Sequence, residues 1–132
     1  MSQEIGLSVR LSGSFDAAVE RVIAALKVEG FGVLTQIDVR DTLKQKLGVD
    51  FRPYKILGAC NPPLAHRALT LAPEVGLLLP CNVTVSEAAP DQIDVALVDP
   101  LMMMSVVARP VLAEVAQDAR GRLERVAAAL SA

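Results

Sequence analysis

The spacing of apolar residues changes along the chain between a period of two and a period of about 3.6, and this change constrains the fold most strongly. Every second residue is apolar over residues 5–11, which predicts a strand. Apolar residues then recur at spacings of three and four from Phe15 to Leu26, which predicts an amphipathic helix. Ser14 is its expected N-cap and Gly30 its expected C-cap, because both residue types favour those positions.

The remaining segments extend this pattern into a β-α-β-α-β-α-β-β-α order. The strands are half-buried rather than continuously apolar, which favours an antiparallel sheet. The expected fold class is α+β, a single two-layer domain over residues 1–132 with a mostly antiparallel sheet of about five strands and helices packed on one face. Strands are expected over residues 31–39, 54–60, 81–88 and 93–100, the last two as a hairpin, and helices over residues 41–48, 61–74 and 110–130.

Composition limits the class of protein. The chain has 132 residues, enough for one domain with its own core. Apolar residues make up 52% of the chain, but the densest apolar segments are far shorter than the roughly 20 residues that span a membrane. The N-terminal segment lacks the basic start and apolar run of a signal peptide. We therefore expect a cytoplasmic protein with no membrane partner.

Charge and cysteine content argue against a nucleic-acid-binding protein and against a disulfide-rich protein. The 13 basic and 15 acidic residues leave no basic excess to neutralise a phosphate backbone. Aromatic residues make up only 3% of the chain, too few for a platform that stacks single-stranded bases, so nucleic acid is not an expected partner. The two cysteines are too few for a disulfide framework and are expected to be thiols.

The segment Cys60-Asn61-Pro62-Pro63 has a structural and a functional interpretation. Asparagine is a preferred N-cap and proline is favoured at the first helical position, so Asn61 and Pro62 predict a helix start without any functional role. The same assignment puts Cys60 just before a helix N-terminus, where the helix dipole lowers the pKa of a thiol. Cys60 is therefore either a buried small side chain or a thiolate that acts as nucleophile or soft metal ligand.

Cys81 and His66 are the other candidate site residues. Cys81 begins the strand over residues 81–88, so its sulfur lies near Cys60 if that strand neighbours the one before it. His66, the only histidine, is expected on the exposed face of its helix, and the alternative is a ligand to a metal ion or a haem. Two cysteines and one histidine are too few for a four-ligand zinc site without a carboxylate, which a dimer could supply.

Other motifs carry little functional information. The run Met102-Met103-Met104 offers soft copper ligands, but consecutive helical residues point in different directions, so packing in the core is the preferred interpretation. The chain has no G-x-G-x-x-G, P-loop, G-x-S-x-G or H-E-x-x-H motif, and no serine stands in an activating context. The sequence therefore leaves open whether the protein is an enzyme.

Three segments together resemble a known family. The segments are ILGACNPPLAHRAL, LLLPCNVTVSE and IDVALVDPLMM, with the characteristic elements at residues 57–61, 65–69, 78–81 and 99–100. This arrangement resembles the bacterial and archaeal domain-of-unknown-function family 302 and extends over nearly the whole chain. The resemblance implies a compact α+β fold, often a homodimer, with no established biochemical activity. It draws attention to Cys60 and Cys81 without assigning a role to either.

Three hypotheses for function follow. The first is a non-catalytic binding module with a site near Cys60, Asn61 and Cys81, whose ligand is a small molecule, a metal ion, a haem, or an anion at the helix N-terminus. The second is a thiol-based redox or thiol-transfer protein that uses Cys60, with Cys81 as the resolving partner. The third is a structural homodimer assembled through the long last helix.

Overall fold

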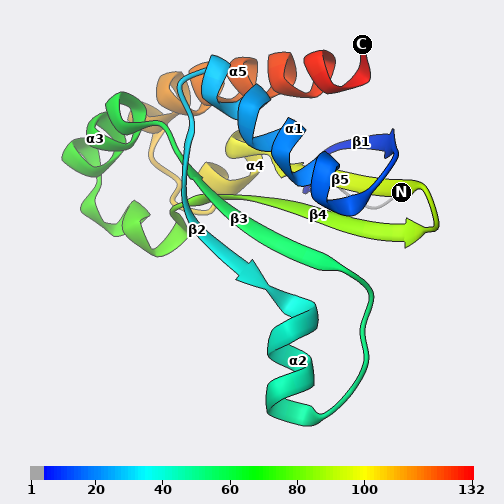
Figure 1. Ribbon diagram of the computed structural model, residues 1–132. Coiled ribbons are helices and arrows are strands. Elements are labelled where there is room, and N and C mark those ends of the chain that lie inside the picture. Colours follow the sequence, from blue (N-terminus) through cyan, green and yellow to red (C-terminus); the bar gives the residue numbers. More distant parts are fainter. Residues whose placement is uncertain (1–4) are drawn as a thin grey trace, which may run out of the picture.

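The computed structural model describes residues 5–132 and shows a five-stranded antiparallel sheet with helices, which confirms the predicted α+β class (Figure 1). The strand order is β1-β5-β4-β3-β2, and every neighbouring pair is antiparallel. The strands are β1 (Gly6–Ser12), β2 (Gly32–Asp38), β3 (Tyr54–Cys60), β4 (Cys81–Ala89) and β5 (Gln92–Val98). The helices are α1 (Phe15–Val28), α2 (Val39–Leu47), α3 (Pro62–Leu71), α4 (Pro100–Ser105) and α5 (Ala113–Ser131), with the 3-10 helices η1 (Pro73–Leu78) and η2 (Pro110–Leu112).

The core forms two clusters that meet along α5. In the first, α1 and α5 cover one face of the sheet (Figure 1), where Leu57, Val83 and Leu97 pack against Val22 and Leu123. In the second, α3, η1 and α4 pack against the first half of α5 at one end of the sheet. The alternation read from the sequence explains the first cluster, because successive strand residues point to opposite faces.

Three helix starts have capping hydrogen bonds, and those at Ser14 and Asn61 confirm the prediction. The Ser14 hydroxyl accepts from the backbone N–H of Ala17 at 3.2 Å and caps α1. The Asp99 carboxylate accepts from Leu101 at 2.9 Å and caps α4. Asn61 caps α3, with Pro62 as the first helical residue. Gly30 follows the C-cap of α1 with a φ of 86°, a conformation that glycine adopts without strain.

Several predicted boundaries are wrong. The helix expected over residues 61–74 ends at Leu71, because a proline at position 73 disfavours the helical conformation of Ala72, which is extended (φ −152°, ψ 90°). The helix expected from Pro110 begins as the 3-10 turn η2 and becomes α-helical only at Ala113. The strand expected to reach residue 100 ends at Val98, since Asp99 serves as a helix cap.

α5 is the longest helix of the described chain, with 19 residues, and it is amphipathic. Its buried stripe includes Val115, Ala119, Leu123 and Val126, as the spacing predicts. Within residues 5–132, no helix combines the length and the apolar character needed to cross a bilayer.

Residues 37–53, called the arm below, project from the rest of the fold (Figure 1). They hold α2, none of whose residues is buried. β2 leads into the arm and pairs with β3 along one edge, while its other edge forms the border of the sheet. The arm therefore gives little to the core of a single copy.

Candidate functional site

β3 and β4 separate at one end of the sheet, and a cavity lies where they part. The two strands pair as far as Ala59 and Cys81. Beyond that pair, β3 continues through Cys60 into α3, whereas β4 is preceded by η1 and by a cis peptide bond between Leu79 and Pro80. Cys60 and Cys81 therefore lie on neighbouring strands, offset by one residue from direct pairing.

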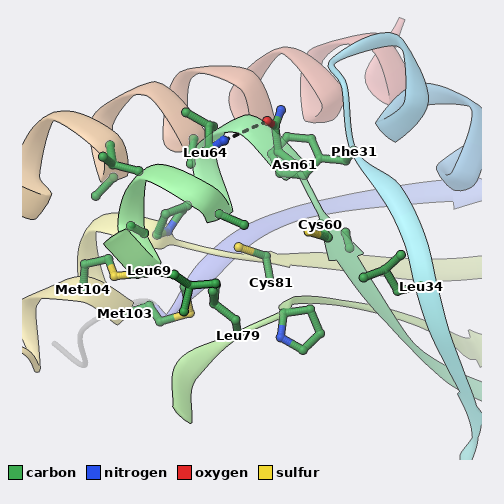
Figure 2. A pocket seen from close by; sticks show the side chains of 18 of the residues that line it. Phe31, Leu34, Cys60, Asn61, Leu64, Leu69, Leu79, Cys81, Met103 and Met104 are labelled. Atoms are coloured by element: carbon green, nitrogen blue, oxygen red, sulfur yellow. Dashed lines mark hydrogen bonds between the residues drawn. The ribbon is translucent and has the colours of Figure 1, made fainter. Parts of the chain in front are cut away.

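The cavity has a volume of about 320 Å³ and a predominantly apolar lining (Figure 2). The lining comes from β2 and the residue before it, from the facing ends of β3 and β4, and from α3, α4 and α5. Thr35 and Asn61 are its polar members besides the cysteines, and none of its described lining residues is charged. The main lining side chains are Phe31, Leu34, Leu64, Leu69, Leu79, Met103, Met104 and Val115.

Both cysteine side chains line this cavity as free thiols. Cys60 is half-buried, and Cys81 is buried. Burial raises the pKa of the Cys81 thiol to about 11, and the neighbouring Cys60 adds a smaller rise. Cys81 is therefore a neutral thiol near pH 7 and a weak nucleophile, because the thiolate is the reactive form.

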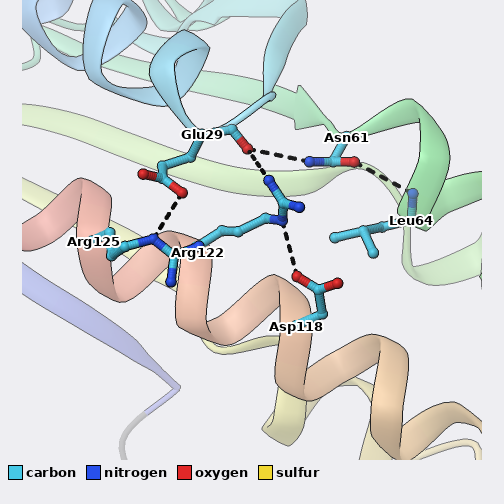
Figure 3. Close-up of polar contacts among 6 residues, drawn as sticks. All are labelled: Glu29, Asn61, Leu64, Asp118, Arg122 and Arg125. Atoms are coloured by element: carbon cyan, nitrogen blue, oxygen red, sulfur yellow. Dashed lines mark hydrogen bonds and ion pairs between the residues drawn. The ribbon is translucent and has the colours of Figure 1, made fainter.

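Asn61 is buried, with 7% of its surface exposed, and both ends of its side-chain amide are bonded (Figure 3). Its Oδ1 accepts from the backbone N–H of Leu64 at 3.3 Å, and its Nδ2 donates to the backbone carbonyl of Glu29 at 3.3 Å. Arg122 donates to the same carbonyl at 3.0 Å and to Asp118 at 2.9 Å. Asn61 thus ties the start of α3 to the end of α1 and, through Glu29, to α5.

Comparison with known proteins places this arrangement in a family. The family model described as "Domain of unknown function DUF302" matches residues 7–130. This chain belongs to the DUF302 family. It is also similar to the crystal structure of an uncharacterized conserved DUF302 protein from Bacillus stearothermophilus, with 33% identity, a TM-score of 0.88 and coverage of 97% of this chain and 99% of that one. No curated protein matches the sequence.

The start of α3 in this DUF302 chain leaves no backbone N–H for an anion. The first two helical residues are Pro62 and Pro63, which have no N–H group. The N–H of Leu64 is bonded to Asn61, and the N–H of Ala65 is bonded to the backbone carbonyl of Asn61. The donors that bind anions at other helix N-termini are therefore absent or occupied here.

His66 does not join the two cysteines in the DUF302 chain. It lies on the exposed side of α3 and is not among the residues that line the cavity. The methionines behave differently from one another: Met103 and Met104 are buried and line the cavity, whereas Met102 does not line it. Among residues 5–132, no three or more His, Cys, Asp or Glu side chains are grouped as metal ligands.

Most residues that line the cavity were not among the candidate site residues identified from the sequence. The sequence pointed to Cys60, Asn61 and Cys81, all of which line it. Leu34 and Leu69 line it as well, and both are exposed apolar residues. The periodicity of α5 indicated that Ala119 is buried, but no sequence signal indicated that it faces a cavity.

Proposed function

We propose that this DUF302 chain is a non-catalytic binding module whose ligand, a small apolar molecule, occupies the cavity beside Cys60 and Cys81. The observation that carries this proposal is the cavity itself, about 320 Å³ in volume with a predominantly apolar lining. Ligand pockets are typically concave, mostly apolar and provided with a few polar groups. Here Thr35 and the two thiols are those groups.

The size of the cavity indicates the size of the ligand. A dry apolar cavity of about 150 Å³ accommodates benzene. The cavity of this chain has about twice that volume, which suits a molecule with one or two rings or a short alkyl chain. Leu34 and Leu69, which are exposed apolar side chains of the lining, give such a molecule an apolar path to the interior.

The chemistry of the lining favours binding over catalysis. A general acid or base must lie within hydrogen-bond reach of the reacting group. The lining residues of the described chain include no carboxylate, imidazole or amine. Asn61 already uses both ends of its amide within the protein, which further limits polar recognition.

Fluorescence titration with the neutral two-ring dye prodan tests the proposal. The dye should bind one equivalent of protein with enhanced emission, and Ala65→Phe should weaken binding because Ala65 lines the cavity. The matched control is Ala17→Phe, an exposed position on α1 that is not among the residues lining the cavity. Equal dye affinity in the two variants, or no saturable binding by the unmodified chain, contradicts the proposal.

A thiol-transfer role is the competing function, and the two thiols on one cavity are the observation that favours it. The raised pKa of Cys81, about 11, argues against a ready resolving thiolate at neutral pH. Titration with a chromogenic disulfide distinguishes the two functions. Rapid reaction of the native protein that disappears in Cys60→Ser, followed by formation of an internal disulfide, would favour thiol transfer over simple binding.

We further propose that the chain forms a homodimer through the arm. The arm exposes apolar side chains, among them Ile37 and Leu47, and the Leu47 side chain is 68% exposed. The free edge of β2 supports pairing with β2 of a second copy, because an unpaired strand edge is a template for another strand. This surface differs from the last helix, through which the sequence suggested assembly.

Sedimentation measurements test the dimer. We expect the unmodified chain to sediment as a dimer and Leu47→Glu to shift it to a monomer without loss of helical signal, since α2 has no buried residue. Leu77→Glu is the matched control, because Leu77 is 90% exposed in η1, outside the arm. A monomeric unmodified chain, or a dimer that survives Leu47→Glu, contradicts the proposal.

A further inference from the structure

A second cavity adjoins the one beside Cys60 and Cys81, which is called the first cavity below. The second cavity has a volume of about 360 Å³ and is lined by α4, the turn after it, η2 and the start of α5. Met104 and Ala116 line both cavities. The two spaces are therefore separated by side chains that belong to the walls of both.

The spacing of small residues on α5 explains how one helix lines two cavities. Ala113, Ala116 and Ala119 follow one another at a spacing of three, so they lie along one side of the helix. Ala119 lines the first cavity and Ala113 the second, while Ala116 lines both. Along this stretch, the side of α5 that borders the two cavities therefore carries methyl groups, which leave room for a ligand.

Met104 is the larger part of the partition. It is buried on α4, and Figure 2 shows it at the α4 side of the first cavity. A methionine side chain is unbranched and has three rotatable bonds, so it adapts to its surroundings more easily than other apolar side chains of its size. With the small Ala116 beside the same two spaces, a change in the Met104 rotamer joins the two cavities.

The two cavities differ in charge. None of the described residues that line the first is charged, whereas the second is lined by Arg109 and by no other charged residue of the described chain. Arg109 donates to the Glu74 carboxylate at 2.6 Å. A guanidinium group has five N–H donors, and no other described hydrogen bond uses those of Arg109. Its planar fork therefore has donors left for the carboxylate of a ligand.

We propose that the two cavities together bind one long-chain carboxylate, with its carboxylate on Arg109 and its alkyl chain passing Met104 into the first cavity. This inference rests on the proposed function, because the first cavity must accept an apolar group. A cavity of about 150 Å³ accommodates the six carbons of benzene. Volumes of about 320 and 360 Å³ therefore have room for a chain of about 12 carbons.

The exposure of Arg109 suits the charged end of such a molecule. Its side chain is 49% exposed, so a carboxylate bound there keeps part of its hydration. Burial of an unpaired charge in the first cavity would be costly, because its lining has no charged residue to compensate it. The alkyl chain has the opposite preference, since removal of apolar surface from water is favourable. The two cavities thus match the two ends of the ligand.

Calorimetric titration with dodecanoate below its micelle concentration, at about pH 8 where the carboxylate is ionised, tests the inference. We expect one dodecanoate per chain and at least about tenfold weaker binding of neutral dodecanol, since hydrogen bonds between charged groups are the stronger ones. Arg109→Gln should weaken dodecanoate binding to the level of dodecanol. Arg67→Gln is the matched control, because Arg67 is a similarly exposed, ion-paired arginine that lines neither cavity.

Glu74→Gln separates ligand binding from a structural role of the ion pair. The substitution removes the carboxylate that competes for Arg109, so dodecanoate should bind more tightly. If the ion pair only held the fold together, Arg109→Gln and Glu74→Gln would both weaken binding. That result would overturn the inference, as would equal affinity of the unmodified chain for dodecanoate and dodecanol.

Chain length tests the passage beside Met104. Affinity should rise from octanoate to dodecanoate in the unmodified chain, and this rise should disappear in Met104→Phe because the rigid ring closes the passage. Met102→Phe is the control, since Met102 lines neither cavity. The same rise in both variants would contradict the inference. Prodan binding that depends on Ala65, together with no dodecanoate binding, would overturn this inference alone and leave the proposed function standing.

Discussion

At the scale of single residues, Asn61 connects three helices through one buried side chain. Its amide caps α3 and also donates to the Glu29 carbonyl at the end of α1, next to Arg122 of α5. Gly30 is held close to it, since a Cβ at Gly30 would lie 3.0 Å from Asn61 Nδ2. The capping role could be predicted from the Asn-Pro dipeptide, but the bond to Glu29 could not, because 32 residues separate the partners.

Replacement of Asn61 by alanine should destabilise the fold more than loss of an exposed cap. Loss of an N-cap typically costs about 1 kcal/mol, and loss of a second hydrogen bond in a buried place adds about 1 kcal/mol more. Urea unfolding of Asn61→Ala should therefore show a loss of roughly 2 kcal/mol. Ser14→Ala removes only the exposed cap of α1 and is the control. Equal losses in the two variants would show that the bond to Glu29 contributes nothing.

Cys81 should make the protein less stable at alkaline pH. Its pKa rises from an ordinary value of 9.0 to about 11 in the folded state. Because the folded pKa is raised, the stabilising effect of the neutral thiol is complete below the unfolded pKa and is lost as pH rises through the folded one. By pH 11 the loss should reach about 2 kcal/mol.

The measurement is the free energy of unfolding from about pH 8 to about pH 11, for the unmodified chain and for Cys81→Ala. Lost packing changes the stability of the variant at every pH, so the relevant quantity is how the difference between the two proteins changes with pH. A difference that stays constant over this range would mean that Cys81 has no raised pKa.

At the scale of elements, the local spacing of apolar residues was sufficient to predict a helix or strand that buries one face. α1, α5 and all five strands could be predicted in this way, because each presents its apolar residues at the spacing its geometry demands. The segment after α3 could not, since Pro73 and the residues after it form the 3-10 helix η1 rather than a last helical turn. α2 is a different case: its caps, Asp38 and Gly48, define it although it buries nothing.

Backbone amides of α2 should exchange hydrogen faster than those of α1 in dilute solution. Local opening is easiest where few apolar contacts are buried, and α2 has no buried residue, whereas α1 buries Ala18, Val19, Val22 and Leu26. Hydrogen exchange followed by mass spectrometry at several protein concentrations checks this. Protection of α2 should rise with concentration if the arm joins two copies. Concentration-independent protection equal to that of α1 would contradict both expectations.

At the scale of the whole molecule, the cavity results from how distant parts of the chain meet. Its wall combines β2, the diverging ends of β3 and β4, and the helices α3, α4 and α5. Sequence patterns identified Cys60 and Cys81 as worth attention and predicted buried faces for the helices. They could not predict that the second core cluster leaves a gap of about 320 Å³, because that depends on how well side chains of distant segments fill the space between them.

The most direct test of the binding function is carbon-13 NMR of the methionine methyl groups during titration with prodan. Met103 and Met104 line the cavity, whereas their neighbour Met102 does not, so the three methyl groups report on the site and on its surroundings. We expect the Met103 and Met104 signals, assigned by leucine substitution, to shift saturably with added dye while the Met102 signal stays in place. Saturable dye binding that leaves the Met103 and Met104 signals unchanged would place the ligand elsewhere and contradict the proposed function.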